Sequence, residues 1–190
     1  NGLGTAIFMS IIVSTVKQEE QMRAIQTQDV LKLVNQTLPY FKEGLTESSA
    51  NESAKVIKDL MKVSAVAITN KTHILAHVGV ASDHHTPDKT IITDLSKAVI
   101  DTGQQKEVYS SKEIGCQHPN CPLEAAIVIP LYIQGDIVGT LKLYFTDYHD
   151  LTFVEKRLAE GLAKIFSSQL ELGAVETQRQ LLQDAEIKSL

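Results

Sequence analysis

The sequence AAIVIPLYIQGDIVGTLKLYF, which spans Ala125–Phe145, decides the fold. It contains two apolar runs, Ala125–Ile133 and Ile137–Phe145, separated by the polar turn Gln134–Asp136. Apolar runs of this length, rich in β-branched residues and joined by a short glycine-containing turn, are typical of an antiparallel strand pair. Pro130 lies inside the first run. Because proline cannot donate a backbone hydrogen bond, we expect an edge or a bulge there.

Further strands are predicted upstream of this pair. Ala65–Thr69 and His73–Gly79 are short apolar runs around the turn Asn70–Thr72, a pattern that indicates a second hairpin. Glu107–Tyr109 is predicted to be a brief strand. The strands therefore follow one another closely enough to pair antiparallel.

Two helices are predicted among these strands. Thr46–Met61 carries its apolar residues at helical spacing, and Thr93–Thr102 ends at Gly103, a residue typical of helix C-caps. Adjacent antiparallel strands with flanking helices predict an α+β fold. We assign residues 41–150 to this globular domain.

Residues 1–16 differ from the rest of the chain. They carry no charge, and Ala6–Val13 is almost continuously apolar. A complete membrane span needs ~20 apolar residues, so this shorter stretch predicts the end of a transmembrane helix, with charged residues beginning at Lys17. The alternative is a buried helix of a soluble protein.

Residues 17–40 are predicted to form a connecting helix. Its second half has one apolar face, made of Val30, Leu33, Val34 and Leu38. Pro39 is expected to end the helix, because a proline pushes the preceding residue out of the helical region. A helix of this kind suits signal conduction into a domain, or a passive tether.

Residues 151–190 predict a long C-terminal helix. Thr152–Glu155 fits a capping box, no proline follows, and the helix would extend ~58 Å. Leu151, Leu158, Ile165 and Leu172 recur every seven residues, which is coiled-coil spacing. We expect the first half to pack on the sheet and the second half to project and pair with a second copy of the chain. The alternative is one amphipathic helix packed on its own sheet.

The composition excludes several classes of function. Eighteen basic and 23 acidic residues give a formal net charge of −5, which argues against a nucleic-acid binder. Two cysteines are too few for a secreted disulfide scaffold. The chain contains no phosphate-binding lysine loop, zinc-protease motif or nucleophile elbow. We therefore expect no catalytic residue and no autophosphorylation by this chain alone.

Chemically versatile side chains gather in two predicted loops. Cys116, His118 and Cys121 offer two thiols and an imidazole within six residues, and His84 or His85 from the earlier loop would complete a tetrahedral set. Sulfur and imidazole ligands together suit zinc or iron. The open alternatives are a redox-switching pair of thiols and cysteines without a chemical role.

Several segments resemble known proteins. The strand pair is similar to the last two strands of a GAF domain. The segments that resemble the LytS family of sensor histidine kinases are Ala65–Thr69, His77–Gly79, Ser82–His85, Ile114–Leu123 and Leu158–Ala163, together with Ala185–Leu190, which is similar to the residues just before that family's phosphoacceptor-histidine box. The resemblance covers essentially the whole chain.

The resemblance implies a GAF domain on the cytoplasmic side of a bacterial, multi-pass membrane protein that works as a homodimer. It implies a kinase region that uses ATP and Mg²⁺ and a LytTR-type response regulator as its partner. It also implies a small-molecule pocket, for which the candidate residues are His77, Asp83, His84 and His85.

We therefore expect a regulatory GAF module that passes a signal to a kinase through paired helices. One alternative is a free-standing GAF enzyme that reduces methionine sulfoxide with its thiols, as some GAF domains do. The other is a structural spacer that binds no ligand and only sets the geometry of a dimer.

Overall fold

The structure is a computed structural model that describes residues 2–61, 63–87 and 93–188, without the side chains of residues 2, 3, 18–27, 29 and 38. The predicted place of Leu38 on an apolar face therefore lies outside the described side chains.

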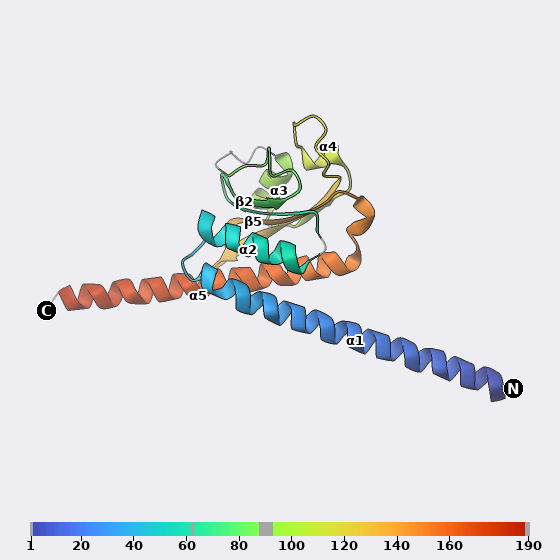
Figure 1. The fold of residues 1–190 in the computed structure, drawn as a ribbon. Helices are drawn as coiled ribbons and strands as arrows, with labels where there is room; N and C mark the ends of the chain where they lie inside the picture. Colours follow the sequence, from blue (N-terminus) through green and yellow to red (C-terminus); the bar gives the residue numbers. More distant parts are fainter. Residues whose placement is uncertain (1, 62, 88–92, 189–190) are drawn as a thin grey trace.

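A five-stranded antiparallel sheet forms the centre of the described fold, in the order β2-β1-β5-β4-β3 (Figure 1). The strands are β1 (Ala65–Asn70), β2 (Ile74–Gly79), β3 (Lys106–Val108), β4 (Ala125–Ile133) and β5 (Asp136–Phe145). β4 and β5 pair along their whole lengths, with Ala125 opposite Phe145. The predicted strand pair and hairpin are confirmed, and with them the α+β class.

Pro130 occupies a place where β4 has a partner on one side only. β3 pairs with β4 no further than Val128, so Pro130 lies beyond the end of that strand. The pairing of β4 with β5 shifts register between Leu131 and Tyr132, and the Tyr132 N–H donates to the Ser167 hydroxyl, 2.9 Å away. Both the local edge and the bulge expected for proline are therefore present.

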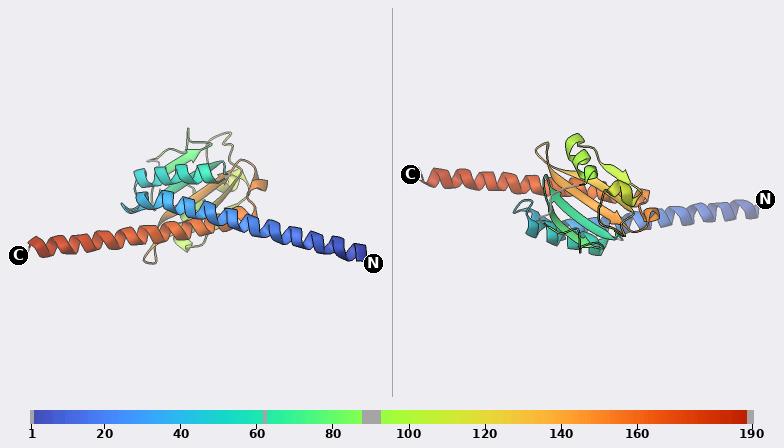
Figure 2. Two further views of the ribbon diagram at one scale, coloured as in Figure 1. Left: turned by 60° about the horizontal axis from the view of Figure 1, so that its bottom comes forward. Right: turned by 90° about the horizontal axis from the view of Figure 1, so that it is seen from above.

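Helices cover both faces of the sheet (Figure 1, Figure 2). One face carries α1 (Gly2–Phe41), α2 (Glu47–Leu60) and α5 (Phe153–Lys188), and the other carries α3 (Asp94–Thr102) and α4 (Ser111–Ile114). A short 3₁₀ turn, η1 (Tyr148–Asp150), connects β5 to α5. The sequence analysis did not predict α4, which is only one turn long.

The alternation of side chains along β5 creates two separate cores. Leu141, Leu143 and Phe145 belong to the core shared with α1, α2 and α5. Tyr144 points to the opposite face, into a smaller core with α3 and α4, and Lys142 is two residues from it on the same face. Within the described part of the chain, four of the eleven buried residues of the smaller core are alanines, which are Ala65, Ala67, Ala81 and Ala126.

The prediction that Pro39 ends the connecting helix is wrong, because α1 continues to Phe41. Phe41 is fully buried and packs on Phe166 of α5, with ring centroids 4.7 Å apart. A proline in the last turn costs the helix one hydrogen bond near its end, and burial of a Phe side chain offsets this by ~2–3 kcal/mol. Leu33 is also buried, as predicted.

α5 confirms the long C-terminal helix, and its two halves differ in burial. Its first half is buried on the sheet through Ala159, Leu162, Ala163, Phe166 and Leu170. From residue 175 to 188 every side chain is exposed, and this part projects beyond the domain (Figure 1). Leu172 of the heptad row is 65% exposed, so pairing with a second copy stays a prediction.

The opposite end of α1 is apolar and uncovered. Side chains between Ile7 and Val16 are mostly exposed, including Phe8 at 65%. Within the described residues, no helix combines the length and the hydropathy that a membrane span requires.

Replacing Gly161 with alanine is expected to raise the free energy of unfolding by about 0.5–1 kcal/mol. Gly161 lies inside α5, and a Cβ added there meets nothing within 4 Å, so alanine gains helix propensity without a clash. Urea denaturation followed by circular dichroism measures the change. A lower midpoint for the variant contradicts the packing described here.

Candidate functional site

Two loops on the α3–α4 side of the sheet bring two histidine and two cysteine side chains together. His84 and His85 come from the turn after β2, and Cys116 and Cys121 from the loop after α4. One ligand atom from each of these residues lies within 4.8 Å of the other three. We call these four residues the His–Cys cluster.

The turn after β2 has a sharply constrained backbone. Gly79 has a φ of +114°, and a Cβ there would lie 2.4 Å from the Ser64 carbonyl oxygen, so only glycine fits. Ala81 then takes a positive φ of 67°, and its carbonyl accepts the backbone N–H groups of both His84 and His85, at 3.3 and 3.1 Å. The chain thereby turns both histidines back towards the sheet.

The second loop is held by short-range backbone hydrogen bonds. The His118 N–H donates to the Cys116 sulfur, 3.5 Å away, and the Cys121 N–H donates to the His118 carbonyl oxygen, 3.3 Å away. A left-handed Asn120, with a φ of 65°, makes the bend between the two halves of the loop.

The two loops touch directly. The Cys121 sulfur lies 3.8 Å from His85 Nε2. His118 stacks on His84 with ring centroids 4.0 Å apart. His84 Nδ1 is 2.9 Å from the Asp83 carboxylate, while its buried Nε2 has no hydrogen-bond partner within the described part of the chain.

His77 lies beneath the cluster, on β2. It is buried, its Nε2 is 2.8 Å from the Val80 carbonyl oxygen, and its ring stacks on His85 at 4.9 Å. Burial lowers the pKa of His77. His77 therefore supports His85 from below and does not belong to the four-residue set.

Burial favours the neutral forms of His85, Cys121 and Tyr144. Desolvation, with the positive charge of neighbouring groups, lowers the pKa of His85 to about 4. Desolvation raises the pKa of Cys121 and that of Tyr144, whose ring centroid is 6.1 Å from that of His85. The hydrogen bond from His84 holds the pKa of the exposed Asp83 below its usual value.

Lys142 was missed by the sequence analysis. It is opposite Ala67, which is itself opposite His77, so the three residues form one row across the sheet. Its ammonium group is buried and donates to the Ser96 hydroxyl of α3, and desolvation lowers its pKa to about 8. The signal that could have revealed it is a single charge between Leu141 and Leu143.

Most of the predicted site residues do meet, although in a different grouping. The predicted ligands His84, His85, Cys116 and Cys121 converge, whereas the predicted ligand His118 is exposed and stacks on the outside. Asp83 and His118 group with His84 in a second, more exposed set. Among the predicted pocket residues, His77 and His85 are buried and Asp83 is exposed.

The sequence matches known proteins along its whole length. It is 69% identical over 190 residues to the sensor histidine kinase/phosphatase LytS of Staphylococcus aureus strain Mu50, and equally to that of strain N315. The chain belongs to the LytS family. It spans 32% of the length of these LytS relatives, and no family model matches it.

Solved structures place the fold of this LytS-family chain among GAF domains. The GAF domain of a phosphoenolpyruvate-protein phosphotransferase from Coxiella burnetii has a TM-score of 0.60 at 12% identity, covering 80% of this chain and 98% of that one. A free methionine-R-sulfoxide reductase from Neisseria meningitidis, solved with its substrate, has a TM-score of 0.53 at 16% identity, covering 75% and 91%. Identities this low show the fold alone. The relatives that are 69% identical to this chain are sensor histidine kinases, which does not favour the reductase alternative.

Proposed function

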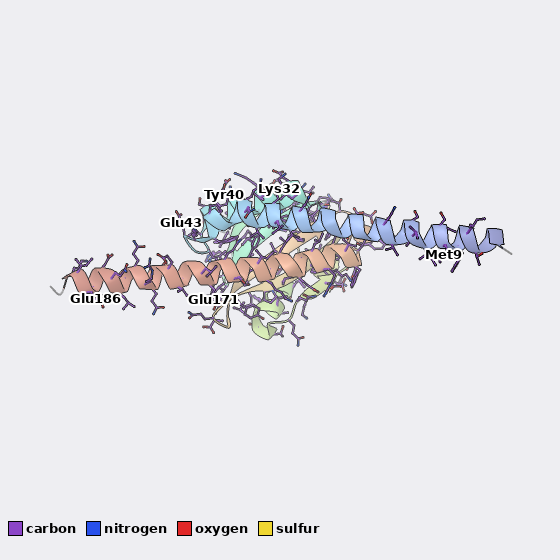
Figure 3. The ribbon with its side chains drawn as sticks, turned by 90° about the horizontal axis from the view of Figure 1, so that it is seen from below. Met9, Lys32, Tyr40, Glu43, Glu171 and Glu186 are labelled. Carbon is purple, nitrogen blue, oxygen red and sulfur yellow. The ribbon has the colours of Figure 1, made fainter. Side chains whose placement is uncertain are left out.

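We propose that this LytS-family chain is the regulatory GAF module of a membrane-bound sensor histidine kinase, and that it passes a signal from α1 to α5. The observation that carries the proposal is a direct contact between these two long helices. They cross side by side under the sheet, and their free ends project on opposite sides of the domain (Figure 3).

The crossing is small and tightly packed. Phe41 packs on Phe166, and the Gln169 side chain donates to the Val34 carbonyl at 3.4 Å. Gln169 is buried and its amide oxygen also accepts the Thr37 hydroxyl at 3.5 Å. A displacement of α1 must therefore move α5 or break these contacts.

Gly173 allows the closest approach of the two helices. A Cβ on this residue would lie 2.8 Å from the Lys42 carbonyl oxygen and 2.9 Å from that of Phe41. The backbone of α1 thus rests directly on the backbone of α5. Beyond this point α5 is exposed, so its position depends on the crossing.

The proposal also assigns the surroundings of the module. We place the apolar start of α1, including Met9 (Figure 3), at the inner surface of a bacterial membrane, as the end of a transmembrane helix. The exposed end of α5, including Glu186, leads to a kinase region that uses ATP and Mg²⁺ and serves a LytTR-type response regulator. The exposed Leu172, Val175 and Leu182 form the seam of a homodimer.

The His–Cys cluster is the proposed cytosolic input of the module. It combines sulfur and imidazole ligands, which suit zinc or iron, and it lies on the face of the sheet opposite α1 and α5. A small molecule that binds over His77, Asp83, His84 and His85 would act at the same place.

Replacing Gly173 with valine in the full-length kinase tests the relay. The larger side chain cannot fit without separating α1 from α5, so we expect autophosphorylation and phosphotransfer to fall by about fivefold or more. Both are measured with radiolabelled ATP on the membrane-embedded protein.

The matched control is Gly161→Val, on the same helix, where an added Cβ meets nothing within 4 Å. This variant should keep most of the activity. If both variants behave alike, or if Gly173→Val leaves the kinase unchanged, α5 is a passive spacer.

A further inference from the structure

We propose that the His–Cys cluster binds one zinc ion in tetrahedral geometry, through its two imidazoles and two thiolates. The inference deepens the proposed function, because it rests on the assignment of this cluster as the input site and names what the site takes. Four steps lead to it.

The first step is distance. A tetrahedral zinc ion, with bonds of ~2.1 Å to nitrogen and ~2.3 Å to sulfur, holds a sulfur and a nitrogen ligand ~3.6 Å apart. The Cys121 sulfur and His85 Nε2 are 3.8 Å apart. All four ligand atoms lie within 4.8 Å of one another, so each pair needs to approach by no more than about 1 Å to reach the spacing of a tetrahedral zinc site.

The second step is the state of His84. Its Nε2 is buried and without a hydrogen-bond partner in the described residues, which is costly for a polar atom unless something binds it. Its Nδ1 faces the Asp83 carboxylate at 2.9 Å. Histidines that bind zinc characteristically donate their other ring nitrogen to a carboxylate, which orients the ring and strengthens the bond to the metal.

The third step is the environment of the sulfurs. The Cys116 sulfur accepts the His118 backbone N–H at 3.5 Å, and a hydrogen bond of this kind stabilises a thiolate, the form that binds metal. The Cys121 sulfur faces His85 Nε2. Both cysteines are partly buried against the smaller core, so the loop holds both sulfurs at the cluster.

The fourth step is charge and selectivity. Two thiolates and two neutral imidazoles balance the charge of Zn²⁺, which suits a site packed against the apolar smaller core. Tetrahedral coordination by two sulfurs and two nitrogens is typical of zinc. His118 stacks on the outer side of His84 and is exposed, so it covers the site without being a ligand.

Zinc bound here would join two loops that are far apart in the sequence. It would connect the turn after β2 to the loop that leads from α4 into β4. In the sheet, β1 and β5 lie between β2 and β4. Loss of zinc would free both loops, because in the smaller core Cys116 and Cys121 are only partly buried.

The test is the zinc content of the untagged 190-residue chain, measured by mass spectrometry after gel filtration without chelator. We expect about one zinc ion per chain, and loss of the metal in Cys121→Ser and in His84→Ala. His118→Ala and the exposed His149→Ala should keep it. Asp83→Ala should keep the stoichiometry with an affinity lower by about 10–100-fold.

Cobalt titration of the metal-free wild-type chain tests the proposal without any substitution, so it gives a result even if a variant fails to fold. The expected result is a sulfur-to-metal charge-transfer band with the strong visible bands of a tetrahedral ion. A chain with no metal, no cobalt spectrum and two reactive thiols overturns the proposal. So do iron in place of zinc, or zinc that survives both ligand substitutions.

This readout is independent of kinase output. A chain without zinc leaves the relay between α1 and α5 standing, and a kinase that ignores Gly173→Val leaves the zinc site standing.

Discussion

Replacing Phe166 with alanine is expected to lower the free energy of unfolding of the chain by about 3–5 kcal/mol. The Phe166 ring is fully buried in the larger core and packs on Phe41 at the crossing of α1 and α5. Removal of the ring leaves a cavity between α1 and α5. The helices cannot move together to fill this cavity, because the contacts at Gln169 and Gly173 hold them in place. Guanidinium denaturation followed by circular dichroism measures the loss.

The matched control is Phe153→Ala, at the start of the same helix, where the ring is 73% exposed. This change should cost less than about 0.5 kcal/mol. The double variant with Phe41→Ala should lose less than the sum of the single losses, because the two rings share one contact. Equal losses for Phe166 and Phe153 contradict the packed crossing on which the proposed relay depends.

Much of the fold could be predicted because it is encoded locally. Two apolar runs joined by the turn Gln134–Asp136 are enough to predict β4 and β5. Gly103 ends α3 with a φ of 67°, as a C-cap glycine does. The prediction was wrong at Pro39. The rule that a proline disfavours helical backbone in the preceding residue considers neighbours in the sequence only, and here tertiary packing outweighs it. The packing of Phe41 on Phe166, which is distant in the sequence, favours the continuation of α1 to Phe41.

The heptad row illustrates the same limit. Leu158, Ile165 and Leu172 repeat correctly for a coiled coil, but the side chains that α5 buries on the sheet belong to another stripe, centred on Leu162 and Phe166. Periodicity predicts that a helix has an apolar face. It does not tell which of two neighbouring stripes the sheet covers.

The residue types of the candidate site were predictable, but their grouping was not. Cysteines beside a histidine in one loop suggested His118 as a ligand, because it is close in the sequence. The positive φ of Ala81 and the turn that follows instead bring in both His84 and His85. Alternation along the strand places Lys142 on the face opposite Leu141 and Leu143, but the sequence does not tell that α3 covers this face and buries the ammonium group.

Replacing Lys142 with methionine is expected to raise the free energy of unfolding at pH 7 by about 2 kcal/mol. Burial lowers the pKa of Lys142 from 10.5 to about 8, and a shift of this size costs the folded state about 3 kcal/mol while the lysine is charged. The methionine variant also loses the hydrogen bond to Ser96, which lowers the gain in the free energy of unfolding by about 1 kcal/mol. Desolvation causes this shift, and no carboxylate within residues 2–61, 63–87 and 93–188 offsets the cost.

The lowered pKa of Lys142 also predicts how the stability of the fold changes with pH. A lysine whose pKa is lower in the folded state destabilises the fold fully below about pH 8, and stability returns as the pH rises, because the unfolded chain then binds more protons. From pH 7 to 9 the wild-type chain should therefore gain about 1 kcal/mol from Lys142. The range stops at pH 9, because the raised pKa values of Cys121 and Tyr144 reverse the trend above it.

Lys106→Met is the matched control, because Lys106 is opposite Val128 in the same row across the sheet but is exposed on β3. It should change neither the stability at pH 7 nor its increase towards pH 9. Lys142→Met should abolish that increase. A Lys142→Met chain that is less stable than wild type, or that keeps the full pH dependence, would mean that the buried ammonium has a counterion. That counterion would lie outside the described contacts, because among these Lys142 shares its face of the sheet with Ser96, His77 and Tyr144 and with no acidic side chain.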